Sequence, residues 1–191
     1  MSRRRKNSLL LSAFLFAAAV IWADRSLIHP RIFPSDFDKY NQKNFTVVKV
    51  VDGDTLDIDI PDANYKTTRI RLWGVDTPET AKSPKGEMYF GNNASQFTKD
   101  TVLGKRITVI LNEDANPRDK YGRLLAYIKL ADGRILNEEL ISTGFAYADI
   151  RFKHPYYDKY IELETTARTN KIGLWKNVTP DQFPKWRQKR D

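Results

Sequence analysis

The residues of this chain best suited to chemistry are carboxylates and arginines between positions 50 and 80. Asp54 lies in one short acidic loop, Asp76 and Glu79 lie in another, and Arg71 lies on a predicted strand between the two loops. Carboxylate oxygens are hard donors that suit calcium or magnesium. A guanidinium is always charged and presents a planar fork of donors that matches phosphate. These residue types therefore predict an open divalent metal site beside a phosphate-binding arginine, as metal-assisted hydrolysis requires.

Several of the acidic residues also have a simpler interpretation. Asp52, next to Gly53, can cap a turn, and we leave it outside the metal shell. Asp57 and Asp59 alternate with apolar residues, so we expect both on the solvent face of a strand. The metal hypothesis therefore depends on Asp54 and Asp76.

Composition excludes several other kinds of site. Cysteine is absent and only two histidines are present, His29 and His154. Disulfides, thiolate catalysis and zinc sites built on cysteine are therefore excluded, and histidine-rich metal sites lack their ligands. The net charge of +8 favours a polyanionic partner, although the N-terminal cluster from Arg3 to Lys6 contributes half of it.

An uncharged apolar run from Ser8 to Ala23 follows this basic cluster. The order is typical of a signal peptide or of a single N-terminal membrane anchor. We expect residues 1–23 to direct the rest of the chain out of the cytoplasm, with membrane contact through residues 8–23 if the signal stays uncleaved. The remaining chain divides into a linker over residues 24–44, a folded domain over 45–176 and a basic surface tail over 177–191.

The folded domain is predicted to be α+β. The expected strands cover residues 45–51, 55–60, 66–75, 106–111 and 124–128, and the expected helices cover 87–103, 136–143 and 154–169. Five short strands and three helices, one of them between the third and fourth strands, predict an OB-type β-barrel, whose strand face and loops commonly hold nucleic acid. In the third strand Arg71 alternates with Ile70 and Leu72, so its side chain should point away from theirs.

Three motifs in this order resemble the staphylococcal nuclease (thermonuclease) family, and the resemblance extends over residues 45–175. They are Asp52-Gly53-Asp54-Thr55, then Val75-Asp76-Thr77-Pro78-Glu79-Thr80 after Arg71, and finally Asp119-Lys120-Tyr121-Gly122-Arg123. The first motif alone is a weak signal. The whole set, with its intervening strand and helix lengths, is highly specific.

The resemblance implies a catalytic site that uses one Ca²⁺, with Mg²⁺ the less expected ion. By this resemblance Asp54 and Asp76 bind the ion through their carboxylates, and Thr77 binds it through its carbonyl. Glu79 handles the attacking water, as a general base or by orienting it. Arg71 and Arg123 are implied to bind the scissile phosphate, where their charge would stabilise the equatorial oxygens of the transition state.

The implied substrate-binding wall departs from the family. Lys120 and Tyr121 match positions that contact substrate phosphate. Two tyrosines that flank the nucleotide in the family prototype are replaced here by Ile150 and Phe152. Phe152 can still stack on a base, so we expect altered nucleotide binding with the phosphate chemistry retained.

The combined interpretation is an exported, monomeric, calcium-dependent endonuclease. Its expected substrate is DNA, with RNA left open, and the resemblance implies 3′-phosphate products. The alternative is a non-catalytic OB-fold module that binds nucleic acid or protein. Such modules typically lack some of the arginines or acids, whereas none of that set is missing here.

Overall fold

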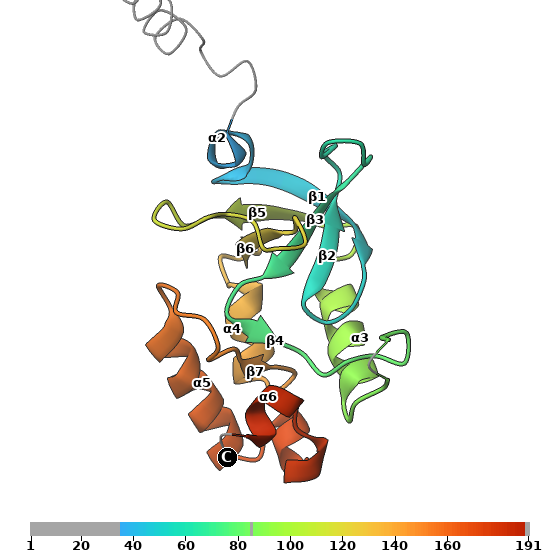
Figure 1. Ribbon diagram of the computed structural model, residues 1–191, viewed down its shortest axis with the longest axis vertical. Helices are drawn as coiled ribbons and strands as arrows, with labels where there is room; N and C mark the ends of the chain where they lie inside the picture. The colour runs from blue at the N-terminus through green and yellow to red at the C-terminus, as the bar shows by residue number, and fades with distance from the viewer. Residues whose placement is uncertain (1–34, 85, 190–191) are drawn as a thin grey trace, which may run out of the picture. The chain divides into compact units, whose positions relative to one another are not determined.

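The computed structural model describes residues 35–84 and 86–189, and five of its strands close a barrel (Figure 1). The order around the barrel is β1-β2-β3-β6-β5, which confirms the predicted five-stranded architecture. Neighbouring strands run antiparallel except β3 and β6, which are parallel. The strands are β1 (Lys43–Val50), β2 (Thr55–Ile58), β3 (Thr68–Leu72), β5 (Arg106–Ile110) and β6 (Leu124–Lys129).

Alternation along β3 places its arginine outside the core, as predicted. Ile70 and Leu72 are buried in the main hydrophobic cluster, while Arg71 between them is only partly buried. Burial of these apolar side chains, at roughly 25 cal/mol per Å² of surface removed from water, stabilises the barrel and fixes the register of β3. The direction of Arg71 is therefore set by the core behind it.

Three helices match the expected ones, with later starts for the first and third. They are α3 (Gly91–Val102), α4 (Leu136–Ser142) and α5 (Tyr157–Thr169). Four further short elements were not expected: α2 (Asp36–Tyr40), η1 (Gly173–Lys176), η2 (Pro180–Gln182) and α6 (Lys185–Gln188).

A second, two-stranded sheet lies beside the barrel. It pairs β4 (Val75–Asp76) with β7 (Tyr147–Ala148), so the strand expected over residues 66–75 is in fact two strands separated by a turn. The turn includes Gly74, whose φ of +75° favours glycine. Because of this break, Asp76 lies on the small sheet and not on a barrel strand.

Both expected boundaries of the domain need correction. Residues 36–44, assigned above to the linker, form α2 and the start of β1, with Tyr40 fully buried. Arg118 holds α2 in place through ion pairs with Asp36 and Asp62, both at 2.6 Å. The tail is also folded, since Phe183 and Arg187 are buried. Apolar and ionic partners distant in sequence therefore extend the domain at both ends.

The expectation for Asp57 was also wrong. Its side chain is buried and accepts two hydrogen bonds from Arg69, its register partner on β3. Asp59 is exposed, as expected. Arg69 thus covers Asp57 across the two strands, whereas Asp59 stays in contact with water.

The apolar run of residues 8–23 lies outside the described residues, as do residues 24–34 of the expected linker. Among the residues that are described, no helix combines the length and the apolar character needed to cross a bilayer.

A buried amide joins the helical layer to the turn that precedes the small sheet. Asn137 on α4 accepts a hydrogen bond from the backbone N–H of Ile128 at 3.0 Å, and it donates to the carbonyls of Trp73 and Ala126 at 3.0 and 3.3 Å. One side chain therefore bonds to three backbone groups, two of which are fully buried.

Replacing Asn137 by Ala should lower the free energy of unfolding by about 2–4 kcal/mol, because buried backbone groups lose their partners. Urea denaturation would measure the change. Asn170→Ala is the matched control, since Asn170 is exposed and bonds only within the last turn of α5. Similar unfolding free energies for the two variants would contradict this role for Asn137.

His154 packs beneath the same turn and is held neutral. Its Nδ1 lies 3.0 Å from the Tyr127 hydroxyl, and a Cβ on Gly74 would lie 2.4 Å from its ring. Burial lowers the pKa of His154 to about 4; Asp149 acts in the opposite direction and Lys153 in the same direction. Protonation of the folded protein is therefore disfavoured at this position.

Stability should fall as the pH drops through the interval between the unfolded pKa of 6.5 and the folded pKa of about 4, because the unfolded state then binds the extra proton. Wild type should lose more unfolding free energy over this interval than His154→Gln, which cannot titrate there. Urea denaturation at several pH values measures both curves. Parallel curves would show that His154 makes no such contribution.

Candidate active site

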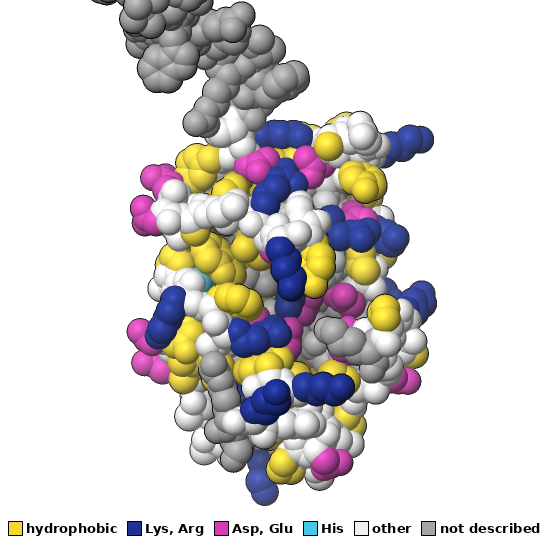
Figure 2. Space-filling model, in the orientation of Figure 1, with side chains coloured by type: hydrophobic (Ala, Val, Ile, Leu, Met, Phe, Trp, Pro, Cys, Tyr) yellow, Lys and Arg dark blue, Asp and Glu magenta, His cyan; other side chains and the backbone are white. Residues whose placement is uncertain are grey.

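The two acidic loops open into a cleft of about 1060 Å³. On the face shown in Figure 2, acidic side chains near the centre are bordered by basic ones. All nine residues proposed from the sequence line this cleft: Asp54, Arg71, Asp76, Thr77, Glu79, Lys120, Tyr121, Arg123 and Phe152. Four loop regions far apart in sequence thus meet at one place.

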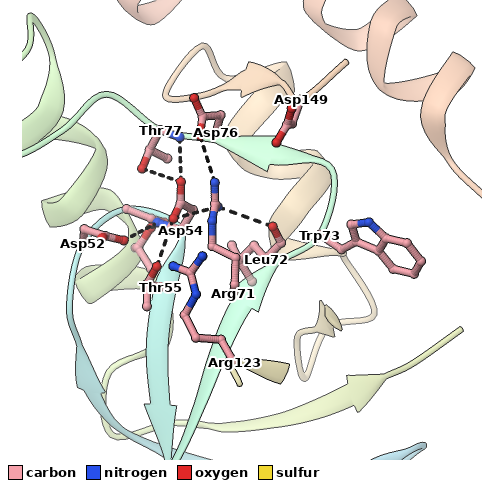
Figure 3. A network of polar contacts seen from close by, with 12 residues as sticks. Asp52, Asp54, Thr55, Arg71, Leu72, Trp73, Asp76, Thr77, Arg123 and Asp149 are labelled. Atoms are coloured by element: carbon pink, nitrogen blue, oxygen red, sulfur yellow. Dashed lines mark hydrogen bonds and ion pairs between the residues drawn. The ribbon is translucent and has the colours of Figure 1, made fainter. Parts of the chain in front are cut away.

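The centre of the cleft is an arginine shared by two carboxylates. Arg71 Nη1 lies 2.7 Å from Asp54 Oδ1, and Arg71 Nη2 lies 2.9 Å from Asp76 Oδ1 (Figure 3). The side chain of Arg71 is only 12% exposed. Both acidic loops therefore converge on one cation, which is Arg71 itself, whereas the sequence predicted that the two acids would meet at a metal ion.

Asp54 is the more deeply enclosed of the two acids. Its Oδ2 accepts hydrogen bonds from the backbone N–H and the hydroxyl of Thr77, at 2.8 and 3.0 Å, and its Oδ1 accepts one from the hydroxyl of Thr55 at 3.1 Å. Burial raises the pKa of Asp54 to about 6, although the charge of Arg71 opposes this change. Ionised Asp54 thus depends on a nearby cation.

Asp76 is held by donors from three elements. Besides Arg71, Arg151 Nη2 donates to Oδ1 at 3.0 Å and Trp186 Nε1 donates to Oδ2 at 2.8 Å. Burial raises the pKa of Asp76, while Arg71 and Arg151 act in the opposite direction. Sequence reasoning had assigned no role to Arg151 or Trp186 at this site.

Close backbone contacts set the positions of the two loops. A Cβ on Gly53 would lie 2.7 Å from the Thr77 side chain, and Thr98 on α3 donates to the carbonyl of Gly53 at 2.6 Å. The start of α3 holds the second loop, because a Cβ on Gly91 would lie only 2.0 Å from the carbonyl oxygen of Glu79. Only glycine permits these approaches without displacement of the neighbour.

Arg123 enters the cleft from the loop before β6 and points toward the Asp54–Arg71 pair (Figure 3). Asp119 holds its guanidinium, with Oδ2 lying 2.8 Å from Nε and 2.7 Å from Nη2. Oδ1 of Asp119 accepts the backbone N–H groups of Tyr121 and Arg123. One carboxylate thus shapes the loop and orients its arginine. Asp119 belongs to the third sequence motif, but no role had been predicted for it.

The three residues expected at the substrate wall are exposed. Tyr121 is 72% and Phe152 63% exposed, and Lys120 is also exposed. Lys120 and Arg123 lie over the Tyr121 ring at 5.0 and 5.4 Å, whereas Phe152 lies beside Arg151. Two aromatic faces therefore line the cleft at positions accessible to a ligand.

The charges that line the cleft are balanced. Six acidic residues face six basic ones. The acids are Asp52, Asp54, Asp76, Glu79, Asp119 and Asp149, and the bases are Arg71, Lys82, Lys120, Arg123, Arg151 and Lys153. A polyanion would therefore bind better with an added divalent cation than in the cleft alone.

The donor chemistry at the centre fits a hard divalent ion. Asp54 and Asp76 present carboxylate oxygens on two sides of one cationic group, and Thr77 lies beside Asp54 and also lines the cleft. Over residues 35–84 and 86–189, no cluster of three or more Asp, Glu, His or Cys side chains is arranged to hold a metal. An ion here would complete its shell with backbone, water or substrate oxygens, which calcium and magnesium accept.

Similar proteins were found for most of the chain. A family described as "Staphylococcal nuclease homologue" matches residues 69–177, a region that begins after Asp54 and ends before α6. The chain is 34% identical to the thermonuclease of Staphylococcus hyicus over 138 residues, covering 72% of this chain and 78% of that protein. It is 37% identical to the thermonuclease of Staphylococcus intermedius over 137 residues, covering 70% and 76%.

A third relative is an uncharacterised protein of Methanocaldococcus jannaschii. It is 30% identical over an alignment of 204 residues, gaps included, and the alignment covers 91% of this chain and 96% of that protein. The family match spans more than half of the chain and includes Arg71, Asp76, Glu79 and Arg123. This chain belongs to the staphylococcal nuclease family.

Proposed function

We propose that the protein is an exported, calcium-dependent endonuclease that hydrolyses phosphodiester bonds of DNA, with RNA as a second candidate substrate, and leaves 3′-phosphate ends. The observation that carries the proposal is the convergence of Asp54 and Asp76 on Arg71, inside a cleft that Arg123 and Glu79 also line. The nuclease names of the two staphylococcal relatives support a nucleic-acid substrate.

Asp54, Asp76 and Thr77 would hold the ion, which supplies positive charge next to the reacting phosphate when bound. Arg71 and Arg123 bind the phosphate itself. Each guanidinium has five N–H donors, and carboxylates use only some of them at either residue. The remaining donors stabilise the charge that grows on the equatorial oxygens during in-line attack.

Glu79 orients the attacking water or accepts its proton. Calcium acidifies bound water less than zinc does, so a carboxylate at the cleft wall is a suitable base. The carbonyl of Glu79 accepts the backbone N–H of Met88 at 2.9 Å, which fixes the loop that carries the side chain. Phe152 and Tyr121 provide stacking surfaces for bases, and Lys120 contacts substrate phosphate.

A chelator should abolish nicking of plasmid DNA by the wild type, and added calcium should restore it. Arg71→Ala or Glu79→Ala should lower kcat/KM by on the order of 10³-fold or more, because charge stabilisation or water activation is lost. Arg134→Ala, in an exposed turn, is the control expected to retain activity. Chelator-resistant cleavage would contradict the metal-dependent mechanism, and DNA binding without turnover would indicate the non-catalytic module instead.

Gly91→Ala should lower kcat by on the order of 10²-fold, since an added Cβ displaces the backbone of Glu79 and misplaces a reacting group by about 1 Å. The added Cβ would lie 2.0 Å from the carbonyl oxygen of Glu79. Asn92→Ala changes the next, exposed residue of α3 and should retain activity. Circular dichroism establishes folding of both variants. Equal kcat values would show that Gly91 does not position Glu79.

A further inference from the structure

Trp186 is a C-terminal residue whose indole reaches the proposed metal site. Its Nε1 donates to Oδ2 of Asp76 at 2.8 Å, across 110 positions of sequence. Trp186 lies on α6, beyond the residues 69–177 that match the family. The contact therefore adds to the site a group that lies outside the nuclease motifs.

The hydrogen bond from Trp186 completes a specific arrangement around Asp76. Oδ1 accepts from Arg71 and Arg151, and Oδ2 accepts from Trp186. An ionised carboxylate has about four lone-pair positions, so these three donors leave one position on Oδ2. They also fix the plane of the carboxylate, because the donors come from β3, from the loop after β7 and from α6.

Arg151 keeps the indole from turning away. Its guanidinium lies 4.9 Å from the centre of the Trp186 ring, a cation–π contact. Asp149 in turn fixes Arg151, with Oδ1 at 2.8 Å from Nε and Oδ2 at 2.8 Å from Nη2. Rotation of the Trp186 side chain would break the stacking contact and the hydrogen bond together.

The next residue anchors α6 to the domain. Arg187 is buried and forms a two-point ion pair with Glu164, at 2.7 and 2.9 Å. The guanidinium also lies over the rings of Tyr147, Trp175 and Phe183, at 5.2 to 5.5 Å. A buried, bidentate pair is demanding in geometry, so it fixes the position of the helix that carries Trp186.

Glu164 connects this anchor to the strand pair that carries Asp76. Its Oε2 accepts the backbone N–H of Ala148 on β7 at 2.7 Å, and Ala148 and Tyr147 pair with β4. The same carboxylate therefore holds both α6 and the small sheet. Glu164 therefore helps to position both Trp186 and Asp76.

We propose that the C-terminal segment, residues 178–189, is a positioning element for the metal site, in which Trp186 orients Asp76 for binding of a divalent cation. The inference rests on the proposed calcium-dependent function. Trp186 is a positioning residue, because it acts on the cation through Asp76. Removing a hydrogen bond to a metal ligand typically weakens metal affinity by about 10- to 100-fold, and we expect a change of that size.

Trp186→Phe tests the inference, because it removes the N–H and keeps a ring against Arg151. Thermal unfolding of the full chain, measured with increasing CaCl₂ and no substrate, gives an apparent Kd from the rise in Tm. This Kd should increase by about 10- to 100-fold in Trp186→Phe. Arg134→Ala, which changes a residue of an exposed turn, is the control, and its Kd should equal that of wild type.

The indole N–H of Trp186 provides a second readout that needs no calcium. Its NMR signal is assigned through its neighbours in the sequence of isotope-labelled wild type, and slow exchange with solvent in metal-free wild type supports the contact with Asp76. Fast exchange would overturn the inference even if the variant failed to fold.

The calcium titrations separate this inference from the proposed function. Equal Kd values for wild type and Trp186→Phe would overturn the inference alone. A wild type that calcium does not stabilise would overturn the calcium dependence as well, and that outcome is visible without any variant.

Discussion

The site depends on the ion pairs that Arg71 makes with two enclosed carboxylates. Burial disfavours the charged forms of Asp54 and Asp76, whose pKa values both rise. Two such anions can face each other only when a cation lies between them, because desolvation removes the water that would otherwise screen their repulsion. The cleft is therefore organised around positive charge at its centre, with or without a substrate.

Three separate parts of the fold supply these groups. Arg71 comes from the barrel, where the burial of its neighbours Ile70 and Leu72 fixes its direction. Asp54 lies in the turn between β1 and β2 and is held by Thr77. Asp76 lies on the small sheet, so its position depends on pairing with β7 rather than on the barrel. The break at Gly74 gives the two acids independent supports, which lets them approach Arg71 from different sides.

The parts of this arrangement that could be predicted from sequence are those with local signals. Period-two alternation placed Arg71 outside the core, and the family resemblance gave nine residues that are among those lining the cleft. Asp57 broke the same alternation rule because its cross-strand partner is Arg69, and such pairing depends on register. The sequence did not single out Gly91, because the need for glycine there comes from its close approach to the backbone of Glu79.

The C-terminal segment could not be predicted for a related reason. Its basic and aromatic residues suggested a surface tail, whereas Arg187 is buried by an ion pair with Glu164, 23 positions earlier. Composition gives the charge of such a residue and does not identify its partner. The contact between Trp186 and Asp76 spans a still longer interval, so it follows from where α6 is anchored.

The two acids differ in what they offer a cation. Asp54 accepts from Thr55, from Thr77 twice and from Arg71, which together use all of the roughly four lone-pair positions of a carboxylate. Asp76 accepts three donors and has one position left. Any ion bound by both acids must therefore compete at Asp54 with an existing donor, and Arg71 is the only one of these donors whose positive charge an incoming cation would replace. Its guanidinium is also the group assigned to the phosphate, so displacement from Asp54 would make more of its donors available to substrate.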